Sequence, residues 1–420
     1  MDKMIIRGGK PLRGTVSVSG SKNTALPILI AALLTDEPVR VLNVPRLRDV
    51  TTTLGLLTDL GAEARWTGDN EVEVCAKKIS SHVAPYELVK TMRASFLVLG
   101  PLLAREGKAR VSTPGGCAIG ARPVNLHISG MRALGAKIQL RNGYVEAHAR
   151  RLSGGRIWLD NPSVGATENI MMAAARARGA TQIENAAREP EIIDLAAMLT
   201  AMGAKIAGAG THVIEIEGVD RLHGVEHEVV PDRIEAGSLM VAAAITGGDV
   251  MIRNAPLAHL EAVTAKLAEA GVEITSDNGA VRVRRTGKLK PVELRTLPYP
   301  GFPTDLQAQM MALLTQASGT SVITETIFEN RFMHAPELIR MGGDILMKGA
   351  TAVVRGPTKL QGAPVMATDL RASMSLILAG LAAERVTEIG RVYHLDRGYE
   401  ALDAKLSALG ARIERVEDSR

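Results

Sequence analysis

A short glycine motif recurs six times along the chain at a nearly constant interval. Each copy is Leu-Gly-Ala or a close variant, follows a stretch with helical periodicity and precedes two short alternating stretches. A glycine directly after a helix is typical of a C-terminal cap, which needs a positive φ. A recurrence of roughly 70 residues predicts one supersecondary unit used six times. The six glycines are Gly61, Gly135, Gly203, Gly271, Gly342 and Gly410.

Each repeat reads as helix, strand, loop, helix, glycine turn and two strands. In the last repeat Thr368 and Asp369 precede an apolar helix over 370–383, and residues 386–389 form a strand. The first helices of the repeats are apolar on nearly every face, which is typical of helices buried all round. We therefore expect an α/β protein in which each domain hides its helices behind its sheets.

The length of the chain predicts more than one hydrophobic core. At 420 residues, two domains of three repeats each are the simplest division. The stretch 227–231, between the third and fourth repeats, is the expected hinge.

Composition narrows the class of protein. The formal net charge of +5 is modest, and aromatic residues make up only 3% of the chain, so little is available to stack on bases. The chain shows neither a membrane-spanning apolar stretch nor a leader-like start, which predicts a cytoplasmic protein without membrane insertion. Two cysteines, Cys75 in an expected strand and Cys117 in a loop, give no disulfide framework and no metal-site spacing.

The starts of the helices concentrate polar and basic residues. Five of the six second helices begin at an arginine, and helix N-termini offer free N–H groups and partial positive charge. This pattern indicates a compact anionic ligand. The alternative is that Asp and Thr merely cap these helices and that the arginines are solvated. The aligned positions are Arg48, Arg122, Arg188, His259, Arg331 and Arg397.

One loop concentrates the reactive chemistry. Residues 113–123 contain Cys117, three glycines and Arg122. A thiol near arginines ionises readily and serves as acid, base or nucleophile. The alternative is a small buried apolar cysteine.

Several segments together resemble the UDP-N-acetylglucosamine 1-carboxyvinyltransferase family of enolpyruvyl transferases. The similarity runs in order along the whole chain. Its segments are GSKNTALP at 20–27, TPGGCAIGARP at 113–123, SVGATEN at 163–169, IENAAREP at 183–190, PDRIEAG at 231–237, PTD at 303–305 and DRGYE at 396–400.

The resemblance implies a reaction and an architecture. The enolpyruvyl group of phosphoenolpyruvate would pass to the 3′-hydroxyl of UDP-N-acetylglucosamine with release of phosphate, the first committed step of peptidoglycan synthesis. The fold would be a two-domain inside-out α/β barrel with the active site in the interdomain cleft. Domain I would span 21–229, and domain II would combine 1–20 with 230–420. We expect no metal, no organic cofactor and no bound nucleic acid. We also expect the protein to be a monomer.

The resemblance also implies catalytic roles. Lys22 and Asn23 match the pair that binds phosphoenolpyruvate. Cys117 matches the family's proton donor or adduct-forming cysteine, the target of fosfomycin-type epoxides. Asp305 matches the residue placed at the sugar hydroxyl, as general base or proton relay. The remaining matches in the expected cleft are Arg122, Arg331, Asp369, Arg371 and Arg397.

Contacts to the nucleotide sugar follow from the same resemblance. The family usually has aspartate where this chain has Asn125, and some members have lysine at the position of Asn161. The first change loses a charge at an expected uracil contact, and the second removes a diphosphate contact. The matching positions are Arg93, Arg122, Pro123, Val124, Asn125, Leu126, Ser163, Val164, Gly165, Asp305 and Ile327.

Two alternatives remain open at this point. The 3-phosphoshikimate 1-carboxyvinyltransferases share the fold and phosphoenolpyruvate, but they lack a cysteine loop like this one. A non-catalytic repeat clamp that binds nucleic acid would use the basic helix starts differently and would show salt-dependent DNA binding without phosphate release.

Overall fold

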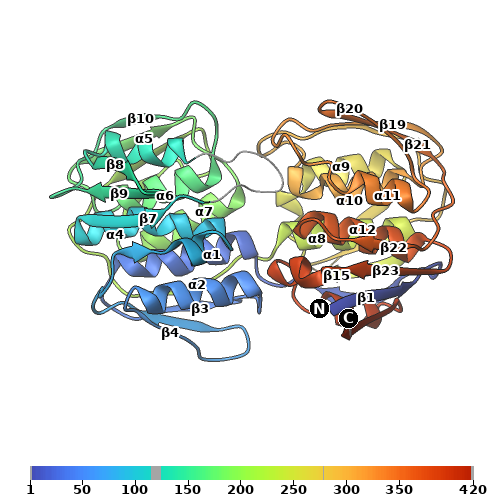
Figure 1. The fold of residues 1–420 in the computed structure, drawn as a ribbon, viewed down its shortest axis with the longest axis horizontal. Coiled ribbons are helices and arrows are strands. Elements are labelled where there is room, and N and C mark those ends of the chain that lie inside the picture. The colour runs from blue at the N-terminus through green and yellow to red at the C-terminus, as the bar shows by residue number, and fades with distance from the viewer. Residues whose placement is uncertain (1, 115–123, 278, 418–420) are drawn as a thin grey trace. The chain divides into compact units, whose positions relative to one another are not determined.

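The computed structural model describes residues 2–114, 124–277 and 279–417. The chain forms two compact units, coloured mainly blue to green and yellow to red in Figure 1. The described part of the first unit comprises residues 20–114 and 124–230, and that of the second comprises residues 2–19, 231–277 and 279–417. Cys117, Arg122 and Pro123 lie outside the described residues.

Three four-stranded sheets form the strand framework of the first unit, one for each repeat. Their strands are β3 (Val39–Leu42), β4 (Glu63–Trp66), β5 (Val72–Cys75), β6 (Val83–Ala84), β7 (Lys108–Ser112), β8 (Lys137–Arg141), β9 (Tyr144–His148), β10 (Arg156–Trp158), β11 (Ala180–Glu184), β12 (Lys205–Ala207), β13 (Val213–Glu217) and β14 (Glu226–Glu228). The sheet orders are β14-β3-β5-β4, β6-β7-β9-β8 and β10-β11-β13-β12.

All three sheets have the same topology. In the second repeat, β6 runs parallel to β7, and β7 pairs antiparallel with β9, with Lys108 opposite His148. The hairpin partner β8 closes the sheet, with Lys137 also opposite His148. In the first unit, the two alternating stretches after each motif glycine therefore form the hairpins that the sequence predicts.

The helices of the first unit lie between these sheets (Figure 1). Nearly every residue of the first helices is buried, including 24–31 and 166–174. The helices are α1 (Lys22–Ala31), η1 (Ala32–Leu34), α2 (Arg48–Asp59), α3 (Tyr86–Val89), η2 (Arg93–Val98), α4 (Leu99–Glu106), α5 (Asn125–Ala133), α6 (Val164–Ala174) and α7 (Pro190–Ala201).

The second unit repeats this plan with a different closure. Its strands are β1 (Asp2–Arg7), β2 (Arg13–Ser17), β15 (Asp249–Arg253), β16 (Glu273–Asp277), β17 (Ala280–Arg284), β18 (Glu293–Arg295), β19 (Gly319–Thr324), β20 (Asp344–Lys348), β21 (Thr351–Gly356), β22 (Pro364–Met366), β23 (Val386–Gly390) and β24 (Arg412–Glu417). The sheet orders are β16-β17-β15-β2, β18-β19-β21-β20 and β22-β23-β1-β24.

Helices again fill the interior of the second unit. The helices α8, α10 and α12 pack against one another, and almost all of their residues are buried. This arrangement confirms the inside-out α/β fold. The helices are α8 (Arg233–Thr246), η3 (Leu257–His259), α9 (Glu261–Glu269), η4 (Thr304–Leu306), α10 (Gln307–Leu314), α11 (Ala335–Arg340), α12 (Leu370–Ala382), η5 (Val392–Arg397) and α13 (Leu402–Ala408).

The N-terminal segment supplies two strands that complete the second unit. β1 pairs antiparallel with β23 and β24, so it takes the place that the last hairpin strand has in the other repeats. β2 pairs parallel with β15 and forms the edge of the first sheet of this unit. The ring of repeats is thereby closed by residues from the opposite end of the chain.

The expected hinge at 227–231 is wrong for its first residues. Residues 226–228 form β14, which pairs parallel with β3 and closes the ring of the first unit. His227 Nε2 lies 3.0 Å from Asp194 Oδ1, and Val230 N donates to Asp194 Oδ2. These contacts fix the segment to the first unit.

The six motif glycines confirm the predicted helix caps. Their φ angles lie between 90° and 105°, a region that side chains rarely adopt. None of the helices in the described residues is long and apolar enough to cross a membrane.

Two glycines of the first unit allow a direct test of this cap geometry. A Cβ on Gly135 or on Gly55 would meet no atom within 4 Å, but only Gly135 has a positive φ, of 90°. We expect Gly135→Ala to lower the free energy of unfolding by about 1 to 2 kcal/mol because of backbone strain. Gly55→Ala, inside α2, should raise it by about 0.5 to 1 kcal/mol. Urea unfolding measures both values, and equal effects would contradict this account.

Candidate functional site

Lys22, at the start of α1 in the first unit, forms an ion pair. The hydroxyl of Ser21 caps the helix by accepting from Thr24 N. Lys22 Nζ lies 2.8 Å from Asp49 Oδ2, and Asp49 is only 3% exposed, in the first turn of α2. Asn23 is half-buried at the next position of α1. A buried carboxylate thus holds the lysine head group at the helix start.

The expected nucleotide-sugar contacts include the first turns of α5 and α6. Ser163 caps α6 by accepting from Ala166 N, and Val164 and Gly165 follow in its first turn. A Cβ on Gly165 would lie 3.3 Å from Cε1 of His127, so a larger residue would press on this ring. Val124 precedes α5, which begins with Asn125 and Leu126.

His127 is a neutral part of this scaffold. Its Nδ1 accepts a hydrogen bond of 3.0 Å from Asn169 Nδ2, and its ring meets Phe96 edge to face. Burial, with a smaller effect of the charge on Arg93, lowers the pKa of His127 to about 3. The amide of Asn169 also accepts from Gly100 N, which joins α6 to α4.

The second unit joins three predicted site residues in one cluster. Arg331 Nη2 donates to Asp305 Oδ1 over 2.7 Å, and Arg371 Nη2 donates to Asp305 Oδ2 over 2.8 Å. Both arginine side chains are 5% exposed and that of Asp305 is 26% exposed. Burial alone would raise the pKa of Asp305, but Arg371 and Arg331 outweigh it and hold that pKa far below its usual range.

Capping explains Asp369 but not Asp305. Asp369 Oδ1 accepts from Arg371 N and Ala372 N and so caps α12. Asp305 makes no side-chain cap at the start of η4. The alternative of capping carboxylates and solvated arginines is therefore wrong for Asp305, Arg331 and Arg371, whereas Arg48 and Arg188 are indeed exposed.

A hydrogen-bond network of buried side chains lies beside this cluster. Gln309 Nε2 donates to Asp305 O over 2.9 Å and lies 3.2 Å from Tyr399 Oη. Tyr399 Oη lies 2.9 Å from Ser238 Oγ, which donates to Ile234 O. Burial raises the pKa of Tyr399, so its hydroxyl stays protonated. This network joins α8, α10 and the segment after η5.

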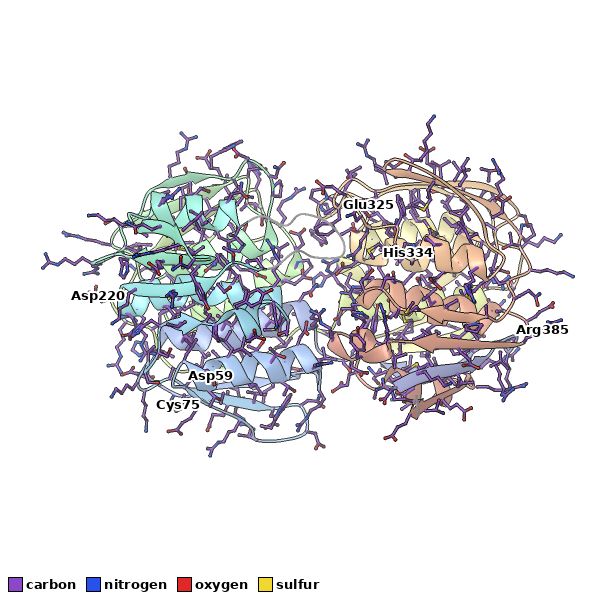
Figure 2. All side chains as sticks on the ribbon, in the orientation of Figure 1. Asp59, Cys75, Asp220, Glu325, His334 and Arg385 are labelled. Atoms are coloured by element: carbon purple, nitrogen blue, oxygen red, sulfur yellow. The ribbon has the colours of Figure 1, made fainter. Side chains whose placement is uncertain are left out.

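Glu325 organises the backbone around Ile327 and Asp305. Its Oε1 accepts from Ile327 N over 2.8 Å and from Thr296 Oγ1 over 2.8 Å. Its Oε2 accepts from Thr304 Oγ1, directly before Asp305. Figure 2 labels Glu325 and His334 within the second unit. The buried carboxylate thus fixes two predicted substrate contacts relative to each other.

His334 is a second buried histidine near the cluster. Burial and the charge on Arg331 lower its pKa to about 4, although Asp369 opposes this shift. Arg397 is half-buried at the end of η5, and the neighbouring Asp396 pairs with Arg415. Sequence reasoning missed Asp49, Gln309, Glu325 and His334, and Tyr399 appeared only inside the DRGYE motif.

Acidic pH should reveal the buried neutral histidine. The pKa of His127 is lowered in the folded state, so the unfolded chain takes up its proton first and stability falls below about pH 6.5. We expect His127 to account for a loss of about 2 kcal/mol between pH 7 and pH 5. Urea unfolding at both pH values should show a smaller loss in His127→Gln. The exposed His212→Gln serves as control, and an unchanged pH dependence in His127→Gln would contradict the assignment.

Comparisons with known proteins agree along the whole chain. The sequence profile of the EPSP synthase (3-phosphoshikimate 1-carboxyvinyltransferase) family matches residues 6–406. UDP-N-acetylglucosamine 1-carboxyvinyltransferases from Geotalea uraniireducens and Geobacter metallireducens are each 60% identical over 418 residues, which cover 100% of both chains.

A solved structure shows the same fold. The enolpyruvyl transferase NikO from Streptomyces tendae is 28% identical, with 99% of each chain covered and a TM-score of 0.90. The chain therefore belongs to the EPSP synthase family of enolpyruvyl transferases and, within it, to the UDP-N-acetylglucosamine 1-carboxyvinyltransferases.

Proposed function

We propose that the protein transfers the enolpyruvyl group of phosphoenolpyruvate to the 3′-hydroxyl of UDP-N-acetylglucosamine and releases phosphate. This function is supported by 60% full-length sequence identity to enzymes named UDP-N-acetylglucosamine 1-carboxyvinyltransferase. The observation that carries it furthest is Asp305 held between Arg331 and Arg371. Such a cluster combines a proton acceptor with two groups that bind carboxylate or phosphate. The reaction would commit its product to peptidoglycan synthesis.

Phosphoenolpyruvate would be bound through its charges. Lys22 and Asn23 lie at the start of a capped helix, where free N–H groups and the helix dipole favour a phosphate. Asp49 balances the charge of Lys22 through their ion pair. Arg122 and Arg397 would contact the phosphate and the carboxylate.

Asp305 is a weak base as long as both guanidiniums hold it. Its pKa is far below the usual range because Arg371 and Arg331 lie within hydrogen-bond distance. An anionic group that binds to Arg371 or Arg331 would offset their charge and raise the proton affinity of Asp305. Substrate binding would thereby prepare Asp305 to accept the proton of the sugar hydroxyl. Asp369 would support this step by holding the start of α12.

Cys117 would supply the complementary acid. In the addition step the sugar oxygen bonds to the substituted carbon of phosphoenolpyruvate, and the methylene carbon takes up a proton that Cys117 would donate. In the elimination step that carbon loses a proton again, and the bond to the phosphate oxygen breaks. Two groups of opposite function are therefore required, and Asp305 and Cys117 fit these functions.

The nucleotide sugar would be recognised mainly by residues of the first unit. Ser163 and Gly165 lie in the first turn of α6, where backbone N–H groups suit a diphosphate. Asn125 offers a carbonyl acceptor to the uracil, and Asn161 contributes no positive charge. The full proposed set is Arg93, Arg122, Pro123, Val124, Asn125, Leu126, Ser163, Val164, Gly165, Asp305 and Ile327.

The alternative acceptor of the enolpyruvyl group is shikimate 3-phosphate, because the matching family profile is named after 3-phosphoshikimate 1-carboxyvinyltransferase. We expect phosphate release from phosphoenolpyruvate only when UDP-N-acetylglucosamine is also present, without added metal or organic cofactor. A colorimetric phosphate assay with either acceptor measures this. Equal turnover with shikimate 3-phosphate would overturn the proposal.

Asp305 provides the sharpest test of the mechanism. We expect Asp305→Asn to lower turnover by on the order of a hundredfold or more, because the amide cannot accept the hydroxyl proton. The same change leaves Arg331 and Arg371 buried without their counter-charge and should cost about 3 kcal/mol of stability. Turnover and urea unfolding are measured on the same preparation at 25 °C. A destabilised variant with normal turnover would reduce Asp305 to a structural role.

A further inference from the structure

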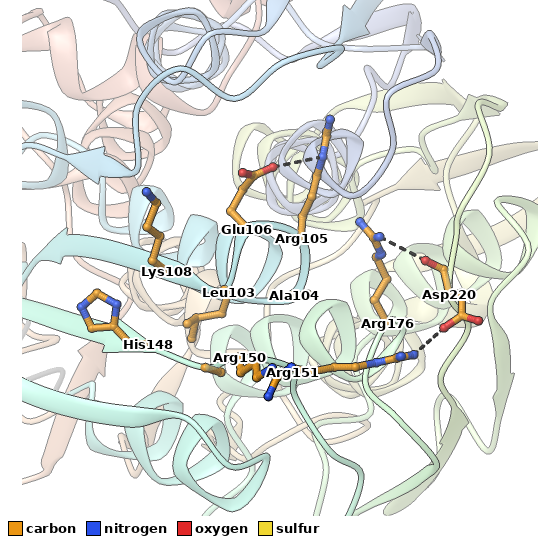
Figure 3. Close-up of a pocket in the computed structure, with 12 residues that line it drawn as sticks. Leu103, Ala104, Arg105, Glu106, Lys108, His148, Arg150, Arg151, Arg176 and Asp220 are labelled. Atoms are coloured by element: carbon orange, nitrogen blue, oxygen red, sulfur yellow. Dashed lines mark hydrogen bonds and ion pairs between the residues drawn. The ribbon is translucent and has the colours of Figure 1, made fainter.

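The first unit contains a basic pocket, and none of the described residues that line it is a predicted site residue. It has a volume of about 530 Å³ and is lined partly by the end of α4, the start of β7 and the segment after β9 (Figure 3). Its charged lining consists of five cationic side chains and two carboxylates. These are Arg105, Lys108, Arg150, Arg151 and Arg176, with Glu106 and Asp220.

The pocket lies at the opposite end of α6 from the predicted substrate contacts. Ser163 and Gly165 are at the start of this helix, and Arg176 lies two residues after its last residue, Ala174. Eleven helical residues separate the two ends by about 16 Å. A ligand in this pocket would therefore leave the start of α6 free.

Two of the five arginine and lysine side chains are already used by the fold. Arg105 donates to Leu33 O over 2.9 Å, to Thr35 O over 2.7 Å and to Ala76 O over 2.6 Å. Arg176 donates to Leu34 O and to Asp220 O. The carbonyls of Leu33, Leu34 and Thr35 lie at the C-terminal end of a buried helical segment, where positive charge is favourable.

The other cations remain available for a ligand. Within the described residues, no hydrogen bond or ion pair holds the side chain of Lys108, Arg150 or His148. Among the described residues, Arg151 pairs only with Asp220, whose side chain is 87% exposed. A stronger anion can displace this exposed carboxylate from Arg151. Figure 3 shows Arg150 and Arg151 on one side of the pocket, opposite Glu106 and Arg105. In addition, the Nε atom of Arg176 is buried and has no partner in the described structure.

We propose that this pocket binds the phosphate chain of a small oligophosphate, either free or carried by a nucleotide. The excess of cations favours several negative charges on one compact molecule, and arginine suits phosphate oxygens in particular. Among the described residues that line the pocket, His148 is the only aromatic ring, so they offer no stacking platform for bases. The volume suits a small molecule. None of the described lining residues is a predicted substrate contact, so binding here does not depend on the proposed function.

Calorimetric titration of the full chain with inorganic tripolyphosphate tests the proposal. We expect one bound equivalent, and we expect Lys108→Gln/Arg150→Gln to weaken binding by about tenfold or more. The matched control is Arg65→Gln/Arg141→Gln, which removes the same charge from exposed positions of β4 and β8 in the same unit. The control should change the affinity less than about twofold. All proteins should have the same melting temperature without ligand.

Two further titrations distinguish a free oligophosphate from a nucleotide, and this pocket from the proposed substrate site. ATP should bind as tightly as tripolyphosphate, since the phosphate chain is what the pocket recognises, and UDP-N-acetylglucosamine should not displace either. Equal weakening in both double variants would show diffuse surface attraction and would overturn the proposal. So would displacement by UDP-N-acetylglucosamine, binding of ATP without binding of tripolyphosphate, or no binding at all.

Discussion

All-round burial of apolar helices is the constraint on which the rest of the structure depends. Once α1, α4 and α6, or α8, α10 and α12, lie inside their sheets, the backbone N–H and C=O groups that lack a helical partner lie at the helix ends. The N-terminal ends carry the capping side chains of Ser21, Ser163, Asp232 and Asp369. The chemistry of the protein is therefore concentrated at the ends of its helices.

The opposite ends of the same helices need positive charge. Arg105 and Arg176 donate to the carbonyls that follow α1 in the first unit, and Arg285 donates to Ala244 O at the end of α8 in the second. Burial lowers the pKa of all three side chains, although each remains protonated at neutral pH. Arginine is suited to this position because one guanidinium reaches several carbonyls. The basic pocket of the first unit is a consequence of this requirement.

The cluster of Asp305, Arg331 and Arg371 pairs buried charges near the starts of helices. One carboxylate serves two guanidiniums, so the cluster carries an excess of positive charge. Gln309 and Tyr399 hold the surrounding backbone and side chains through neutral hydrogen bonds, which do not change that balance. Under the proposed function, an anionic substrate would balance this excess of positive charge.

The sequence by itself determined the repeat, the helix caps, the hairpins and the family. Glycine after a helix, alternation in strands and apolarity on every face are local signals, and each has one dominant structural solution. Residues 227 and 228 were misread as a hinge because their pairing partner, β3, lies far away in the chain. Sequence separation likewise explains why the contacts of Asp49 with Lys22 and of Glu325 with Thr304 were missed.

Only the tertiary structure decided how the charges are paired. Arg371 and Asp305 are 66 residues apart, and nothing local distinguishes their pairing from a helix cap at Asp305 and a solvated arginine. Asp369 has the same local sequence signal and does cap its helix. The physical reason is that the energy of a buried charge depends on which other charges share its low-dielectric surroundings, and the fold alone brings those together.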